Sequence, residues 1–116
     1  MNNFSGVQER VNDFAAERDW KQYHDPKNLI MALSTELGEL NALFRWVANG
    51  DSDAAASREP LRQAMKEEIG DIGILLLLLC TRVRVDLLDA ISSKLEINAR
   101  KYPAGKARGR AERPDK

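Results

Sequence analysis

Four acidic residues stand in two pairs whose members are three positions apart. Glu36 and Glu39 form the first pair, and Glu68 and Asp71 form the second. In a helix, side chains at this spacing lie one turn apart on neighbouring positions of the surface. Two antiparallel helices that carry such pairs can bring four carboxylates to one point, where they repel one another unless divalent cations bind them. The spacing therefore predicts a metal site made of carboxylates.

The apolar residues around these acids favour the same interpretation. On a helix that turns by about 100° per residue, the apolar residues around each acid pair fall on one arc. The arc around the first pair contains Leu29, Leu33, Leu40, Leu43, Phe44 and Val47. The arc around the second pair contains Leu61, Met65, Ile72, Leu75, Leu76, Leu79 and Val83. Glu36 and Glu68 fall inside these arcs, where a carboxylate loses hydration unless a cation or hydrogen bonds replace the water. Glu39 and Asp71 lie about 60° outside the arcs. The alternative is that Lys66 or Arg62 neutralises an acid locally, but the identical offset of the two pairs favours a shared site.

The types of ligand indicate which metal binds. Di-iron helical bundles place a histidine three positions after a glutamate, and no histidine stands at that spacing here. Four oxygen donors without nitrogen or sulfur suit Mg²⁺, with Mn²⁺ as a substitute. Because Mg²⁺ held by carboxylates takes waters and substrate phosphates as its other ligands, we expect phosphate chemistry.

A polar, basic stripe near the end of the chain is suited to phosphate groups. Lys94, Asn98 and Lys101 follow one another at intervals of four and three positions, and the stripe ends at Tyr102. On a helix this spacing places the three side chains on one face. The alternative interpretation is a solvated lysine face.

Aromatic residues gather just before the helical segment that carries the first acid pair. Trp20, Tyr23 and His24 stand close together, and Trp46 follows the first acid pair. Such rings either stack on a base or close the end of a helical bundle.

Composition limits the classes of protein that the chain can represent. Its 116 residues and 13.1 kDa suit one domain. Eighteen basic and eighteen acidic side chains cancel, so we expect no nucleic-acid partner held by bulk charge. Cys80 is the sole cysteine, which excludes an internal disulfide and a thiolate metal cluster. The uncharged run Ile72–Cys80 is too short to span a membrane, and no signal-peptide pattern follows Met1, so we expect a cytoplasmic protein without a membrane partner.

Helical periodicity predicts the first two helices. The first begins near Phe4, with Ser5–Gln8 as a capping box. Asp25–Pro26 caps the second, which we expect to run to about Gly50. Turn-forming residues then predict a loop over 49–59.

Two more helices complete an all-α, four-helix bundle. The third runs from Pro60 to about Arg82, and the fourth begins at Asp86 and stops at Tyr102–Pro103. We expect one domain over residues 1–103 and a basic, flexible tail over 104–116, which contains five basic and two acidic side chains.

The third helix also carries apolar residues outside its main arc. Ile74, Leu77 and Leu78 make it hydrophobic on all sides. A helix of this kind is surrounded by its own fold or by another chain. In a chain this small, we expect a second copy to cover these residues.

The acid pairs and the closing Lys94-x-x-x-Asn98-x-x-Lys101-Tyr102-Pro103 resemble the MazG-like all-α nucleoside triphosphate pyrophosphohydrolases. The stretches 14–20 and 23–29 are most similar to the dCTP pyrophosphatase branch. The likeness covers about residues 4–103. It implies a Mg²⁺-dependent hydrolase that splits dCTP and other nucleoside triphosphates into a monophosphate and pyrophosphate, and that forms a dimer or a tetramer made of two dimers.

The resemblance also implies a role for each candidate residue. The metal ligands, which are also the catalytic residues, are Glu36, Glu39, Glu68 and Asp71. The phosphate-binding residues are Lys94, Asn98, Lys101 and Tyr102. The residues that line the nucleoside pocket are Trp20, His24 and Trp46.

The resemblance to the animal dCTP enzymes has two departures at positions that it places near the base. A histidine stands there in place of Val11, and a tyrosine in place of Leu75. Both positions lie near the base, so we expect a less sharp preference for dCTP. Two alternatives stay open: an enzyme of the same fold that acts on dUTP or phosphoribosyl-ATP, and a non-catalytic helical module that holds a cation and binds a partner.

Overall fold

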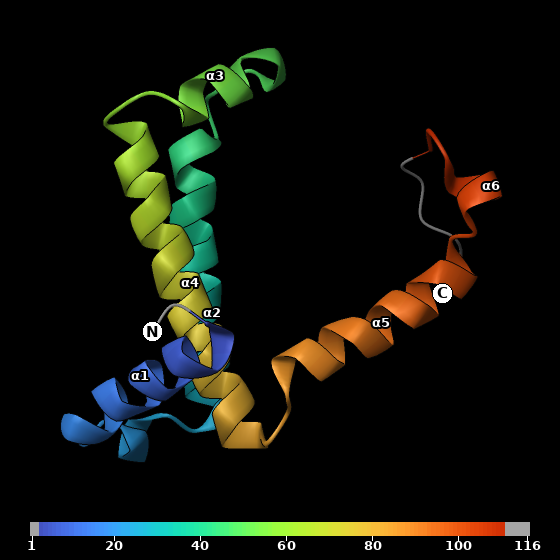
Figure 1. Ribbon diagram of the computed structural model, residues 1–116. Helices are drawn as coiled ribbons and strands as arrows, with labels where there is room; N and C mark the ends of the chain where they lie inside the picture. Colours follow the sequence, from blue (N-terminus) through green and yellow to red (C-terminus); the bar gives the residue numbers. More distant parts are fainter. Residues whose placement is uncertain (1–2, 111–116) are drawn as a thin grey trace. The chain divides into compact units, whose positions relative to one another are not determined.

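The computed structural model describes residues 3–110, and all regular elements within this range are helices (Figure 1). They are, in chain order, α1 (Phe4–Glu17), η1 (Lys21–Tyr23), α2 (Pro26–Phe44), η2 (Asn49–Asp51), α3 (Ser52–Ala56), α4 (Leu61–Val83), α5 (Leu87–Lys101) and α6 (Ala104–Ala107), where η marks a 3₁₀-helix. The all-α prediction is confirmed.

The chain divides into two compact units that meet between Arg84 and Val85. The first unit contains α1 to α4, and the second contains α5 and α6. Helix α6 lies at the start of the predicted tail, and residues 111–116 of that tail lie outside the described range.

Local sequence explains three boundaries of helices α2 and α5. The Asp25 side chain accepts a hydrogen bond from the Asn28 backbone N–H at 2.8 Å, and Pro26 occupies the first position of α2. Asp86 accepts a hydrogen bond from the Leu88 N–H at 3.1 Å and begins α5. Helix α5 ends at Lys101, directly before Tyr102 and Pro103. These predicted boundaries are confirmed.

Three local predictions were wrong. Asn3, and not Ser5, caps α1, because its side chain accepts a hydrogen bond from the Gly6 N–H at 2.7 Å. Helix α2 ends at Phe44 rather than near Gly50. The predicted loop contains η2 and α3, whose Ala-rich sequence favours helix.

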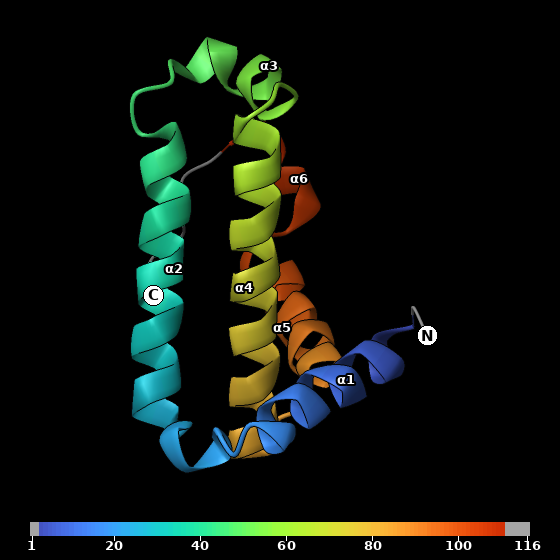
Figure 2. The same ribbon diagram turned by 90° about the vertical axis from the view of Figure 1, so that its left-hand side faces the viewer.

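The acid pairs lie on two antiparallel helices, α2 and α4, which stand side by side and are joined at one end by η2 and α3 (Figure 2). Glu36 lies eight residues before the end of α2, and Glu68 lies seven residues after the start of α4. Because the rise per residue is the same in both helices, these two acids lie at closely similar heights along the pair.

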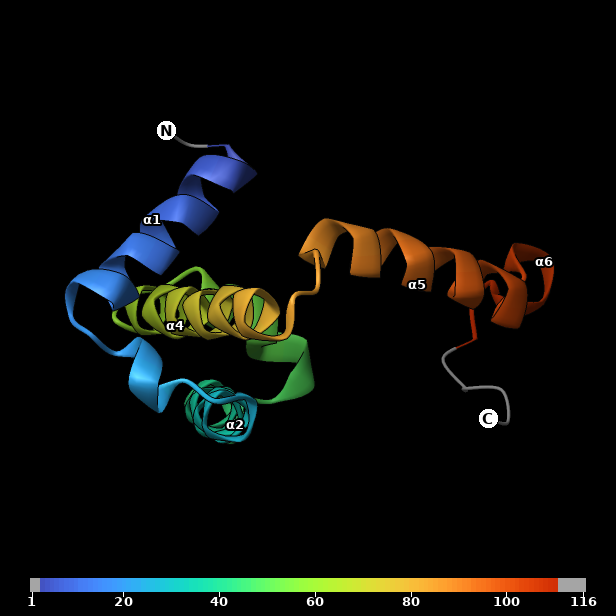
Figure 3. The ribbon, with the colours of Figure 1, turned by 90° about the horizontal axis from the view of Figure 1, so that it is seen from below.

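Helix α1 crosses α4 near the end of α4 that lies away from α3 (Figures 1 and 3). The Thr81 hydroxyl of α4 donates a hydrogen bond to the Asn12 side-chain oxygen of α1 at 3.1 Å. The buried apolar side chains of the first unit come from α1, α2 and α4: Ala15, Leu29, Leu77 and Cys80.

The prediction that Leu77 needs a second chain to cover it was wrong. Leu77 is only 8% exposed within the single chain, so its own fold covers it. Ile74, by contrast, is 42% exposed. Helix α4 contacts both α1 and α2 of its own chain. Within the described residues, no helix combines the length and apolar character that crossing a membrane requires.

Candidate active site

Three glutamates from the two antiparallel helices converge in the first unit. One carboxylate oxygen from each of Glu36, Glu39 and Glu68 lies within 4.8 Å of the others. We call these three residues the acid cluster. Asp71 lies outside this group, but its charge acts on both Glu36 and Glu68. The structure thus brings together the two acid pairs that are about thirty residues apart in the sequence.

Proximity changes the acidity of two members of the cluster. A hydrogen bond shared with the Glu39 carboxyl group is the largest cause of the raised pKa of Glu36, which reaches about 7. Loss of hydration and the negative charges of the neighbouring acids act in the same direction. Loss of hydration is the main cause of the raised pKa of Glu68, followed by the charge of Glu39. Both shifts thus have the same origin, the loss of hydration and the crowding of acidic groups in the cluster.

The residues of the cluster fit a divalent cation. Glu36 Oε2 and Glu68 Oε2 are buried atoms without a hydrogen-bond partner, and an unpaired buried oxygen of this kind is energetically costly. All the donors are carboxylate oxygens, the ligands that Mg²⁺ and Mn²⁺ prefer.

Local neutralisation does not occur in the described part of the chain. The ion pair found there joins Arg18 Nη1 and Glu17 Oε1 at 3.7 Å, far from the cluster in sequence. Lys66 makes no ion pair with the cluster. The Arg62 guanidinium instead donates to the Ala56 carbonyl oxygen at 3.5 Å.

A cavity of about 630 Å³ includes one side of the acid cluster, and we call it the main cavity. Glu36 and Asp71 contribute its carboxylates, and Thr35 lies next to Glu36 in the lining. The remaining lining residues are apolar or aromatic: Phe14, Ala15, Trp20, His24, Ala32, Ile74, Leu75 and Leu78. Its volume lies within the usual range for small-molecule sites, roughly 300–1,000 Å³.

The segment between α1 and α2, residues 18–25, supplies two of these lining residues, and we call it the aromatic loop. The Trp20 ring meets the Phe14 ring edge-on, with centroids 5.7 Å apart and an interplanar angle of 73°. His24 Nδ1 is buried and has no hydrogen-bond partner. The main cavity therefore combines carboxylates with aromatic rings and an unused polar nitrogen. With a divalent cation on the carboxylates, it would suit a compound with an anionic group and a flat ring.

Comparison with known proteins gives a consistent result. No protein-family model matches the sequence. The chain is 48% identical over 96 residues to dCTP pyrophosphatase 1 of Homo sapiens and 46% identical over 99 residues to that of Bos taurus. These matches cover 83% and 85% of this chain but 56% and 59% of the relatives, so the chain spans a little over half of their length.

The structural similarity extends over nearly the whole of a solved protein. A pyrophosphatase from Archaeoglobus fulgidus shares the fold with a TM-score of 0.82 and 32% identity, over 89% of this chain and 94% of that chain. The chain belongs to the MazG-like all-α pyrophosphohydrolases.

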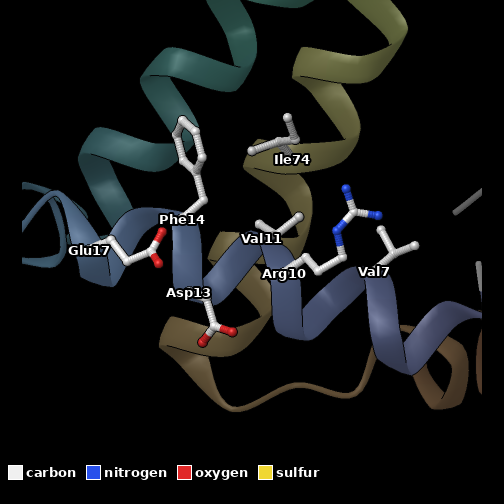
Figure 4. Close-up of a pocket in the computed structure, with 7 residues that line it drawn as sticks. All are labelled: Val7, Arg10, Val11, Asp13, Phe14, Glu17 and Ile74. Carbon is white, nitrogen blue, oxygen red and sulfur yellow. The ribbon is translucent and has the colours of Figure 1, made fainter. Parts of the chain in front are cut away.

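The two positions singled out in the sequence, Val11 and Leu75, both lie at cavities. Leu75 lines the main cavity. Val11 lines a second cavity of about 580 Å³, where Figure 4 shows side chains of α1 together with Ile74 of α4. Phe14 and Ile74 line both cavities, so the two spaces adjoin. Aliphatic side chains therefore occupy both positions.

Trp46 lies away from the other predicted pocket residues. It follows the end of α2 at Phe44, is 90% exposed and does not line the main cavity. Its role in nucleoside binding stays a prediction.

The predicted phosphate-binding residues belong to the second unit. Lys94 and Asn98 lie together on α5 and line a shallow cavity of about 290 Å³. Lys101 Nζ lies 6.0 Å from the centroid of the Tyr102 ring, and the Tyr102 N–H donates to the Asn98 carbonyl oxygen at 2.7 Å. These four residues therefore form a local group at the end of α5, and their role also stays a prediction.

Sequence reasoning missed Phe14 and Thr35 as residues of the site. Phe14 supports Trp20 from α1, and Thr35 lines the main cavity beside Glu36. The signal for Phe14 was available, because it belongs to the stretch 14–20 that resembles the family. Thr35 had no comparable signal, since a threonine next to an acid is common in helices.

Proposed function

We propose that this chain hydrolyses nucleoside triphosphates, dCTP and other deoxynucleotides among them, to a monophosphate and pyrophosphate in the presence of Mg²⁺. The acid cluster at the edge of a cavity with an aromatic end is the observation that carries this proposal. The relatives named dCTP pyrophosphatase 1 support a nucleotide as the substrate class.

Glu36, Glu39 and Glu68 hold the divalent cation in this proposal, with Asp71 beside them. When bound, the cation supplies neutralising charge for the triphosphate and increases the acidity of a coordinated water. The raised pKa values of Glu36 and Glu68 support this role, because carboxylates that crowd one another bind a cation readily.

The aromatic loop binds the base in this mechanism. Trp20 offers the exposed part of its ring for stacking, and Phe14 supports it from behind. His24 Nδ1 is available for a hydrogen bond to the ring of the substrate. The aliphatic side chains of Leu75 and Leu78 exclude water from the same space.

We assign the phosphate groups to the basic stripe of α5. Lys94 and Lys101 supply positive charge for the pyrophosphate leaving group, while Asn98 and Tyr102 offer hydrogen bonds. The spacing of these residues on α5 and the likeness to the family support the assignment.

A screen of pyrophosphate release over the common NTPs and dNTPs, with Mg²⁺, Mn²⁺ or EDTA, tests the proposed function. We expect release from several dNTPs with Mg²⁺ and none with EDTA. Activity confined to dUTP or to phosphoribosyl-ATP identifies a different enzyme of the same fold. Cation binding without any pyrophosphate release overturns the proposal in favour of a non-catalytic module.

We also infer that the protein is a homo-oligomer, either a dimer or a tetramer. Large apolar side chains are exposed in both units, including Ile69 on α4 and Leu88 and Leu95 on α5, which are 53%, 51% and 63% exposed. Exposed apolar surface of this extent marks an interaction site. Light scattering on the purified protein is expected to give two or four times the chain mass of 13.1 kDa. A stable monomer at micromolar concentration contradicts the inference.

A further inference from the structure

The aromatic loop must be held in place relative to the acids, because the two groups come from different segments of the chain. Trp20 and His24 lie on the loop, whereas Glu36 and Asp71 lie on α2 and α4. A stacked base and a bound triphosphate belong to one molecule. The distance between the loop and the acid-bearing helices therefore determines whether the base and the triphosphate of one substrate molecule can bind at the same time.

Hydrogen bonds within the loop fix its shape and its connection to α2. The Gln22 side-chain amide donates to the Asp19 carbonyl oxygen at 3.0 Å and to the Asp19 carboxylate at 3.1 Å. The Asn28 side-chain amide at the start of α2 donates to the Tyr23 carbonyl oxygen at 3.2 Å. None of these three bonds reaches α4.

Arg82 makes the connection to α4. Its Nη1 donates a hydrogen bond of 3.0 Å to the carbonyl oxygen of Lys21, which lies 61 positions earlier in the chain. The same carbonyl oxygen accepts the backbone N–H of His24 at 3.1 Å. Arg82 thus binds the loop at the turn that separates Trp20 from His24, and its bond shares an acceptor with the backbone of His24.

The position of Arg82 on α4 suits this role. It lies in the last turn of the helix, where a positive charge interacts favourably with the helix dipole. The preceding residue, Thr81, is bound to Asn12 of α1. Helix α4 also carries Asp71 and Glu68, so one continuous helix links the acids to the anchor of the loop.

We propose that Arg82 is a positioning residue that holds the aromatic loop, and through Trp20 and His24 the base of the substrate, at a fixed distance from the acids of α4. The proposal rests on the proposed function, because it needs the loop to bind the base. Arg82 does not line the main cavity and acts through the loop alone.

Steady-state kinetics of Arg82→Ala test this role. We expect the KM for dNTPs to rise about 3- to 10-fold, as for the loss of one ordinary, solvent-exposed hydrogen bond, while kcat changes less than about twofold. Inhibition by pyrophosphate is expected to stay unchanged, because pyrophosphate has no base. Arg82→Lys keeps a charged donor and is expected to restore most of the affinity. Arg62→Ala removes the same charge from the far end of α4 and serves as the matched control.

A double-mutant cycle with Trp20→Ala separates failure of this proposal from failure of the proposed function. If Arg82 acts through Trp20 and His24, Arg82→Ala raises KM by a smaller factor in the Trp20→Ala background than in the unmodified protein. An unchanged KM in Trp20→Ala contradicts the base-binding role of the loop, and the positioning role with it. If Trp20→Ala raises KM but Arg82→Ala does not, or if the two effects multiply, only the positioning role is wrong.

One further outcome is decisive, and a folding control accompanies it. Equal weakening of nucleotide and pyrophosphate binding in Arg82→Ala shows a general structural effect and overturns the proposal. Circular dichroism is used to verify folding, and if Arg82→Ala does not fold, Arg82→Gln replaces it with the same expected result.

Discussion

Replacement of Trp20 by alanine tests the proposed base site most directly. Trp20 is 44% exposed, and the rest of its surface packs inside the first unit, partly against Phe14. A tryptophan side chain has up to about 250 Å² of surface, so roughly 110 Å² remains accessible. A base that stacks on one face covers about half of this, or ~55 Å², which contributes about 1.4 kcal/mol at ~25 cal/mol per Å².

This free energy corresponds to about a tenfold change in affinity, near the lower end of the range of ~1–3 kcal/mol for base stacking on aromatic side chains. We therefore expect Trp20→Ala to raise the KM for dCTP about tenfold. We expect kcat to change less than about threefold, because the ring lies away from the scissile bond in the proposed mechanism. The KM reports binding only where substrate dissociation is faster than chemistry, so fluorescence titration with a non-hydrolysable dCTP analogue supplies a direct dissociation constant.

Tyr23→Ala is the matched control. Tyr23 lies on the same loop and is 62% exposed, but it does not line the main cavity. Its backbone carbonyl, which Asn28 binds, is retained in the variant. A folded Trp20→Ala protein with an unchanged dissociation constant, or a Tyr23→Ala protein that loses as much affinity, would refute the stacking argument.

Three further predictions concern the acids, the base and the core. Glu36→Gln is expected to abolish turnover and, in EDTA, to melt at a higher temperature than the unmodified protein at pH 8 but not at pH 4. The sign follows from the raised pKa of Glu36, about 7 against 4.5, since the folded metal-free protein loses stability as pH rises between these values; calorimetry that shows destabilisation at pH 8 contradicts this. With Leu75 in the main cavity, kcat/KM for dCTP is expected to exceed that for the other dNTPs by less than about 1,000-fold, roughly 4 kcal/mol. Leu75→Tyr is expected to increase this preference for dCTP. A ratio above about 1,000-fold in the unmodified protein means that the pocket is misassigned. Leu29→Ala is expected to lower the free energy of unfolding by about 2–5 kcal/mol, because Leu29 is only 2% exposed; a urea titration that shows a loss below 1 kcal/mol contradicts its place in the core.

The helix boundaries that the sequence predicted correctly depend on short-range interactions. Asp25 and Asp86 bind backbone N–H groups within three residues of themselves, and Pro103 limits the conformation of its immediate neighbour. The end of α2 had no such signal, because no proline or capping glycine directly follows Phe44. Its position was therefore not available from local sequence.

The acid cluster was predictable because it depends on helical spacing and one antiparallel pairing. Glu36 and Glu68 each interrupt an apolar arc, and a burial cost of this kind has few explanations other than a cation. Glu36, Glu39 and Glu68 converge, while Asp71 lies outside this group, and their role as metal ligands stays a prediction.

The tertiary structure alone decided which other residues join the acids. Trp20 and Trp46 look equivalent in the sequence, but the aromatic loop places Trp20 in the main cavity, while Trp46 follows the end of α2 and stays exposed. Leu77 is buried because α4 packs against α1 as well as α2, and a single-helix projection contains no information on that crossing. The bond from Arg82 to Lys21 spans 61 positions and depends on the same crossing. Spacing along one helix fixes which side chains share a face, but contacts between segments depend on how the helices pack, and local sequence does not encode that.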